Sequence, residues 1–273
     1  MTHADKAGCS RKATAILIGG AEQKTGERTI LREVAARAGT SPLVVCTVGS
    51  TIPGQMFGVY KRAFAGLGVT DVVHVPVGKR EAADDVGAAE AVGLAKVFFF
   101  TGGDQLRITS MLGGSRLWDA VQRMYQRGGT VAGTSAGASA LGHTMPISAE
   151  ADEHRVSAAS SLLPALGLLK DLIVDQHFAQ RGRMGRLIAG VSENPRLLGI
   201  GIDENTAAVW TAGVFRVIGS GAVYVVDGRE VSRSNVAGAE LQCAMSTFDL
   251  RLHVLSSQDC FDVAKRRPFS KSG

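Results

Sequence analysis

The sequence predicts an α/β fold in which a mostly parallel sheet carries helices on both faces. Short apolar runs rich in Val, Ile and Phe, such as 13–20 and 96–103, alternate with segments of helical periodicity. Buried parallel strands joined by helices of about 10–15 residues produce this alternation. No Pro- or Ser-rich linker divides the 273 residues. We therefore expect one domain over 1–273, with 1–12 and 264–273 as flexible ends.

The first half of the chain reads as repeated strand–helix units. Strands are expected at 13–20, 42–50, 71–77 and 96–103, and helices at 27–39, 56–68, 80–93 and 115–129. In the first helix Ile30 and Val34 share one face, and Gly39 is placed to end it. A further strand begins at Thr130 and leads into a glycine-rich turn.

The second half keeps the strand pattern. The apolar runs at 168–178 and 197–213 carry polar residues at their ends. Residues 214–228 alternate like antiparallel strands around a glycine turn, and the chain shows no internal repeat. We therefore expect the same domain to continue through this half.

Composition and charge exclude several classes of partner. The formal net charge is +5, and the densest basic run, 264–273, lies at the chain end. No basic face with interleaved aromatic residues is present, so no nucleic-acid partner is expected. The four cysteines form no Cys-x-x-Cys pair, so neither a metal site nor a disulfide framework is expected. No apolar stretch reaches the roughly 18 residues of a membrane span, and residues 1–20 lack a secretion signal, so a cytoplasmic protein without membrane contact is expected.

Ser135 stands between two glycines in a Gly-x-Ser-x-Gly arrangement, directly after the strand that begins at Thr130. In a sharp strand-to-helix turn, side chains at Gly133 and Gly137 would clash, and the serine projects its Oγ above the sheet. The amide of Ala136 at the start of the following helix would face an oxyanion. A glycine-rich turn also holds serine for packing reasons alone. The local sequence leaves both interpretations open.

His177 is the preferred base among the six histidines, because it ends an apolar strand. Ligand sites collect at the carboxyl ends of strands in open parallel sheets. The base needs a carboxylate that fixes its tautomer. Glu150 and Glu153 in one loop, and Asp203 and Glu204 at the end of another strand, are the candidates.

A second glycine site follows the aromatic strand 96–103. Gly102 and Gly103 let a backbone N–H approach a ligand and could supply a second oxyanion donor. Asp104 and Gln105 would then line the cleft. The alternative is an ordinary strand-to-helix turn in which Asp104 caps the helix.

Four segments taken together resemble cyanophycinase, a family of serine peptidases that belongs with aspartyl dipeptidase E. They are "IGGAEQK" (18–24), "FFFTGGDQLRI" (98–108), "GGTVAGTSAGASALG" (128–142) and "DQHFAQRGRMGRL" (175–187), the last followed by "GIGIDENTA" (200–208). The resemblance implies a three-layer α/β/α fold akin to class I glutamine amidotransferase domains. It also implies intracellular hydrolysis of cyanophycin, a poly-aspartate with arginine on each side-chain carboxylate, to β-Asp-Arg dipeptides. The resemblance implies no metal or organic cofactor, and it implies a homodimer.

The same resemblance assigns roles to single residues. Ser135 matches the nucleophile and His177 the general base, while Glu153 and Glu204 both match an acid, with Glu153 preferred. The substrate-binding candidates, chosen for their positions at strand ends, are Asp104, Gln105, Asp175, Gln176, Arg181, Arg183 and Arg186. Asp175 and Glu204 could pair with substrate guanidinium, and the three arginines could clamp substrate carboxylates.

Two other functions remain open. A peptidase of the same fold could act on small Asp-X dipeptides. A non-catalytic binding module on the same scaffold would not need Ser135 or His177.

Overall fold

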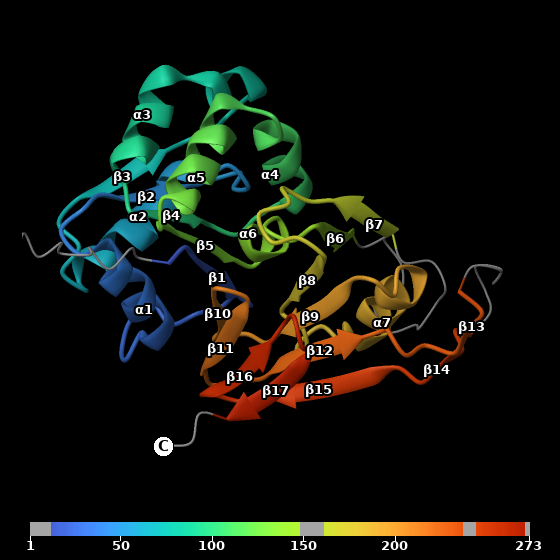
Figure 1. The fold of residues 1–273 in the computed structure, drawn as a ribbon. Helices are drawn as coiled ribbons and strands as arrows, with labels where there is room; N and C mark the ends of the chain where they lie inside the picture. Colours follow the sequence, from blue (N-terminus) through green and yellow to red (C-terminus); the bar gives the residue numbers. More distant parts are fainter. Residues whose placement is uncertain (1–11, 148–160, 237–243, 271–273) are drawn as a thin grey trace, which may run out of the picture.

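The computed structural model describes residues 12–147, 161–236 and 244–270 (Figure 1). Its larger sheet has nine strands in the order β17-β16-β11-β10-β1-β5-β4-β2-β3. The five at one side run parallel: β1 (Thr14–Ile18), β2 (Leu43–Cys46), β3 (Val72–Val75), β4 (Val97–Phe100) and β5 (Thr130–Thr134). They confirm the strands predicted for the first half of the chain.

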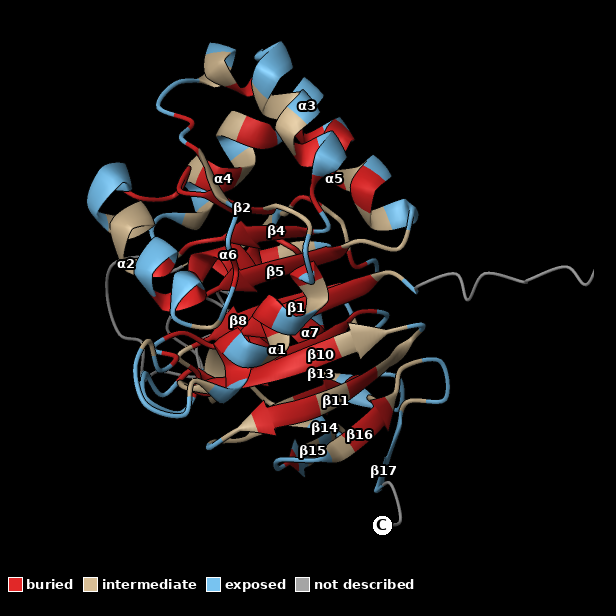
Figure 2. Ribbon diagram, turned by 90° about the vertical axis from the view of Figure 1, so that its left-hand side faces the viewer, coloured by how far each residue is buried: buried red, intermediate tan, exposed pale blue. Residues whose placement is uncertain are grey.

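Helices cover both faces of this parallel part. One face packs against α1 (Thr29–Ala38) and α2 (Pro53–Ala65), and the other against α3 (Val86–Leu94) and α5 (Arg116–Gln126). Alternate strand residues supply the two cores: Phe98 and Phe100 face α5, whereas Phe99 faces α2. Figure 2 shows the strands buried and the helices exposed on their outer sides. The predicted helices on both faces are confirmed.

Two short elements depart from the predicted helices. The helix expected at 80–93 is divided into a 3₁₀ turn, η1 (Arg80–Asp84), and α3, because Asp85 caps α3 by accepting the Ala88 amide at 2.7 Å. The helix α4 (Gln105–Leu112) lies outside the four predicted ranges and begins directly after Asp104, as the alternative interpretation of Asp104 as a helix cap requires.

The antiparallel side of the larger sheet comes from the end of the chain. It contains β10 (Thr206–Thr211), β11 (Val214–Gly219), β16 (Asp259–Asp262) and β17 (Arg267–Ser270). Residues 267–270, which lie within the end expected to be flexible, form β17. All four residues of β17 are exposed, so backbone pairing with β16 and one hydrogen bond from Ser270 Oγ to Asp259 Oδ1 at 3.2 Å hold the strand, and the sequence carries no apolar pattern for it.

A second sheet of six strands has the order β15-β12-β9-β8-β6-β7. Its strands are β6 (Thr144–Ile147), β7 (Ser161–Pro164), β8 (Leu172–Gln176), β9 (Leu198–Ile202), β12 (Val223–Asp227) and β15 (Arg251–Leu255). Its parallel pairs are β6–β8 and β8–β9, and α7 (Met184–Glu193) packs on these strands. A small ribbon of β13 (Arg233–Ser234) and β14 (Thr247–Phe248) completes the described chain. The α/β class is confirmed, but the strands form two large mixed sheets instead of one.

The two sheets meet where β1 and β5 of the larger sheet and β8 and β9 of the smaller one end. Backbone hydrogen bonds join the segments that follow these strands, including His177 N to Gly19 O at 2.8 Å. The predicted site residues after β5, β8 and β9 are thereby brought to one place. No helix within the described ranges has the length and apolar character to cross a bilayer.

Candidate active site

Ser135 lies at the tip of a tight turn between β5 and the short helix α6 (Ala136–Ser139). Its backbone has φ 54° and ψ −121°, and its N–H donates to Ile18 O at 2.9 Å. A Cβ on Gly133 would lie 2.3 Å from Gly137 O, and one on Gly137 would lie 2.7 Å from the Phe100 Cβ. Both flanking glycines are therefore required for the turn, as the sequence predicts.

Three side chains from separate strand ends form a hydrogen-bonded row. Ser135 Oγ lies 2.9 Å from His177 Nε2, and His177 Nδ1 lies 2.6 Å from Glu204 Oε1. His177 follows β8 and Glu204 follows β9. This is the arrangement of a serine, a base and an orienting acid in acyl-transfer enzymes.

The surroundings of His177 favour its neutral imidazole. Burial lowers the pKa of His177 below its ordinary value, the hydrogen bond to Glu204 opposes this, and the charge of Arg181 lowers the pKa further. With its Nδ1–H donated to Glu204, the neutral ring leaves the lone pair of Nε2 facing Ser135 Oγ. The ring can therefore accept a proton from the serine at neutral pH.

Glu204 is the only one of the predicted acids that the structure places on the imidazole. Glu150 and Glu153, the second of them preferred from the sequence, lie outside the described residues. Asp203 is buried and accepts the amides of Ala179 and Ala222, both at 3.0 Å, so it fastens the loop after His177 to the β11–β12 turn.

The candidate oxyanion donors lie beside the serine. A Cβ on Gly102 would be 3.3 Å from the Ser135 Cβ, and Ala136 is the next residue in the turn. Within the described part of the chain, the amides of Gly102, Gly103 and Ala136 donate to no backbone acceptor. These N–H groups are thus available to an oxygen that approaches Ser135.

A cavity of about 240 Å³ collects the predicted substrate residues. Six of the seven line it: Asp104, Gln105, Gln176, Arg181, Arg183 and Arg186. Gln105 donates to Pro146 O at 2.6 Å, and Gln176 Oε1 lies 3.3 Å from Ser135 Oγ, so the cavity opens next to the serine. Three arginines and one carboxylate make its lining positive.

Asp175 does not line this cavity. Its side chain is fully buried, and Arg186 binds both of its oxygens, with Nε 2.6 Å from Oδ2. Arg183 lies 3.4 Å from Oδ1 and donates to Gln176 O at 2.7 Å. The expectation that Asp175 pairs with a substrate guanidinium is wrong, because the chain's own arginines occupy it. It orients the arginines instead.

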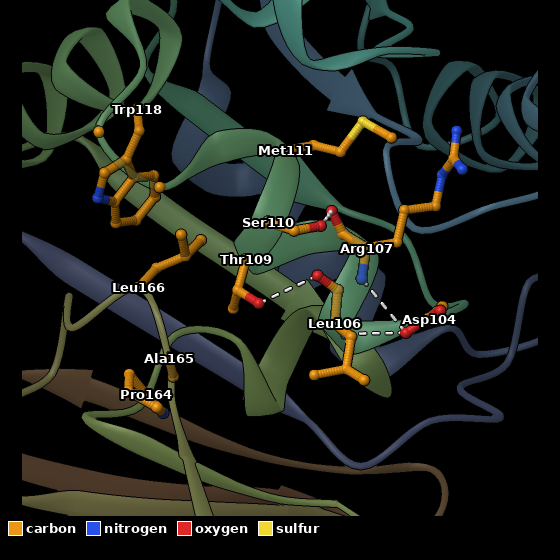
Figure 3. A pocket seen from close by; sticks show the side chains of 12 residues that line it. Asp104, Leu106, Arg107, Thr109, Ser110, Met111, Trp118, Pro164, Ala165 and Leu166 are labelled. Atoms are coloured by element: carbon orange, nitrogen blue, oxygen red, sulfur yellow. Dashed lines mark hydrogen bonds between the residues drawn. The ribbon is translucent and has the colours of Figure 1, made fainter.

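Asp104 has the role of a helix cap. Its Oδ1 accepts the amides of Leu106 at 2.8 Å and Arg107 at 3.3 Å at the start of α4. Figure 3 shows this carboxylate turned toward the helix, at the rim of a second cavity of about 790 Å³. That larger cavity lies between α4 and Pro164–Leu166 and contains none of the three hydrogen-bonded residues. The alternative interpretation of Asp104 as a cap is confirmed.

The sequence did not indicate the residues that support the row. The Gln180 side-chain oxygen accepts the Glu204 amide at 3.1 Å, and the backbone of Gly20 lies against the His177 ring. These contacts join segments more than 20 residues apart, so no local pattern points to them. Residues 12–147, 161–236 and 244–270 contain no group of three or more His, Cys, Asp or Glu side chains that could hold a metal ion.

Comparisons with known proteins identify relatives of this chain. The chain is 37% identical over 256 residues to a cyanophycinase of Synechococcus elongatus, covering 92% of this chain and 80% of that protein. It is 37% identical over 260 residues to a cyanophycinase of Trichormus variabilis, covering 93% and 87%. The crystal structure of a peptidase from an acI-B1 actinobacterium shares the fold, with a TM-score of 0.67 and 20% identity over 93% of this chain and 98% of that one. The sequence profile of peptidase family S51 matches residues 15–218, and the chain belongs to this family of peptidases.

Proposed function

We propose that this peptidase hydrolyses cyanophycin to β-Asp-Arg dipeptides through an acyl-enzyme on Ser135. The observation that carries the proposal is the row Ser135–His177–Glu204, which opens beside a cavity lined by three arginines. The substrate follows from the relatives named cyanophycinase, which match most of the chain.

In the acylation step His177 Nε2 takes the proton of Ser135 Oγ while Oγ forms a bond to the substrate carbonyl carbon. The electron pair of the C=O bond moves to its oxygen, which the amides of Ala136 and Gly102 or Gly103 stabilise. The intermediate then collapses, the C–N bond breaks, and His177 gives its proton to the leaving amine. Glu204 stabilises the imidazolium between these steps. A water molecule, deprotonated by His177, releases the acyl group in the same way.

The charged side chains of the cavity are complementary to the charges of the substrate. Arg181 is exposed, and Arg183 and Arg186 are held by Asp175, so the three guanidinium groups can bind free carboxylates of the substrate. Asp104 uses Oδ1 for its helix, which leaves Oδ2 for a substrate guanidinium. Gln105 and Gln176 would hydrogen-bond the amide groups between repeats.

Several broader features belong to the same proposal. We assign the chain to a single peptidase domain with a fold akin to class I glutamine amidotransferases, and its Ser135 turn to a nucleophile elbow. The tight glycine contacts around Ser135 support the elbow. A cytoplasmic location and a homodimer are supported by the family resemblance alone, and light scattering of the purified protein tests the second.

The experiment that tests the substrate compares cyanophycin granules with the dipeptide Asp-Leu. We expect turnover of the granules and little or none of Asp-Leu. Turnover of Asp-Leu alone would establish the dipeptidase alternative. A serine-directed phosphonate tests the binding-module alternative, because it should label the wild type and not Ser135→Ala.

A further inference from the structure

The carboxylate of Glu22 is buried behind the candidate nucleophile, outside the cleft. Its side chain is 0% exposed, and Lys24 Nζ lies 3.1 Å from Oε1. Oε1 accepts the Tyr60 hydroxyl and Oε2 accepts the Thr134 hydroxyl, both at 2.6 Å. A buried carboxylate holds its hydrogen-bond donors in place, because the loss of one donor would leave the negative charge of the carboxylate partly uncompensated.

The two hydroxyl donors come from different layers of the fold. Tyr60 lies on α2, and its ring packs on Phe99 of β4 with centroids 4.8 Å apart. Burial and the charge of Glu22 raise the pKa of Tyr60 well above its ordinary value, so the phenol stays protonated and keeps donating. Thr134 is the last residue of β5 and directly precedes Ser135.

Glu22 also lies at the end of the segment 18–22, whose backbone accepts hydrogen bonds from the amides of Ser135 and His177. Ile18 O accepts the Ser135 amide at 2.9 Å, and Gly19 O accepts the His177 amide at 2.8 Å. The next residue, Gly20, lies directly against the His177 ring. The loop 18–22 thus contacts the serine and the histidine, and Glu22 ties its far end to the residue before the serine.

We propose that Glu22 is a positioning residue that, through Thr134 and Tyr60, sets the distance between Ser135 Oγ and His177 Nε2. This inference rests on the proposed roles of Ser135 and His177. Glu22 touches no reacting atom, so its removal should slow the chemical step and leave substrate binding unchanged.

The test uses three substitutions: Thr134→Val and Tyr60→Phe each remove one hydroxyl donor to Glu22, and Glu22→Gln removes the carboxylate charge together with its ion pair to Lys24. Each is expected to slow phosphonate labelling of Ser135 and kcat on cyanophycin by about tenfold, with KM within about twofold. Thr134→Ser keeps the hydroxyl and should restore the labelling rate. Thr14→Val is the matched control, since Thr14 is a buried threonine of the neighbouring strand β1 whose hydroxyl is hydrogen-bonded at the opposite end of the sheet. Thermal unfolding establishes that each variant is folded.

Three results would overturn the proposal. Thr134→Val and Tyr60→Phe could both be labelled at the wild-type rate, Thr14→Val could be labelled as slowly as Thr134→Val, or Thr134→Ser could be labelled as slowly as Thr134→Val. Labelling does not depend on the substrate. If the wild type is labelled but does not hydrolyse cyanophycin, the proposed substrate fails and the labelling rates still decide the role of Glu22.

Discussion

Replacement of Gly20 by alanine tests whether the position of the His177 ring controls activity. An ideal Cβ on Gly20 would lie 2.3 Å from His177 Cε1 and 2.4 Å from Nε2. Carbon atoms in contact are about 3.5–4.0 Å apart, so the ring has to move by more than about 1 Å. Ser135 Oγ is 2.9 Å from Nε2, and such a shift takes the pair beyond the hydrogen-bond reach of about 3.2 Å. A misplacement of about 1 Å lowers the rate by about 10²-fold.

The assay is kcat/KM on cyanophycin, with phosphonate labelling of Ser135 as a second measure. Gly20 has φ +102°, so alanine there also strains the backbone. Gly68→Ala is the matched control, because Gly68 has φ +88° and a Cβ added there would meet no heavy atom within 4 Å. Gly68→Ala should therefore keep wild-type activity. A folded Gly20→Ala enzyme within about threefold of the wild type would refute the reasoning, since the loss worked out above is about 10²-fold.

Three further predictions concern the charges around the site. The base must be neutral, and the pKa of His177 is lowered, first by burial and also by the charge of Arg181, so the acid limb of the kcat/KM profile should lie below pH 6.5. Arg181→Gln removes a charge that lowers this pKa and should move the acid limb to higher pH. A pH profile with an unchanged acid limb would contradict this. Glu204→Gln should lower kcat by at least about 10²-fold because the imidazolium loses its partner, and steady-state kinetics with near wild-type kcat would exclude that role. Asp175→Ala leaves the Arg186 guanidinium without its carboxylate and should lower the free energy of unfolding by about 3 kcal/mol; denaturant unfolding with no change would show that the pair adds nothing.

The sequence predicted the parallel half of the fold well, because its strands are apolar runs buried on both faces. It did not predict that the strands of the second half divide between two sheets, nor the strands β15, β16 and β17. These strands are four or five residues long, and the apolar residues Leu252 and Val254 of β15 and the whole of β17 are exposed, so they carry little core pattern. The pairing of β15 with β12 and of β16 with β11 joins segments far apart in the sequence, which local periodicity does not contain.

The site was predicted where a residue's neighbours in sequence are also its neighbours in space. The glycines around Ser135 belong to one turn, and Gly-x-Ser-x-Gly spacing identifies them. Glu204, by contrast, meets His177 only through the alignment of β8 with β9, so the sequence left the acid open. Asp175 was misassigned because a buried carboxylate beside arginines looks the same in sequence whether it binds them or a ligand. The contacts of Glu22 cross three elements and leave no local signal.

The most direct test of the proposed catalysis is mass spectrometry of the products released from cyanophycin by the wild type and by Ser135→Ala. We expect β-Asp-Arg dipeptide from the wild type and none above background from Ser135→Ala. Thermal unfolding should show both proteins folded. Release of the dipeptide by folded Ser135→Ala at the wild-type rate, or no release by the wild type, would contradict the proposed roles of Ser135 and cyanophycin.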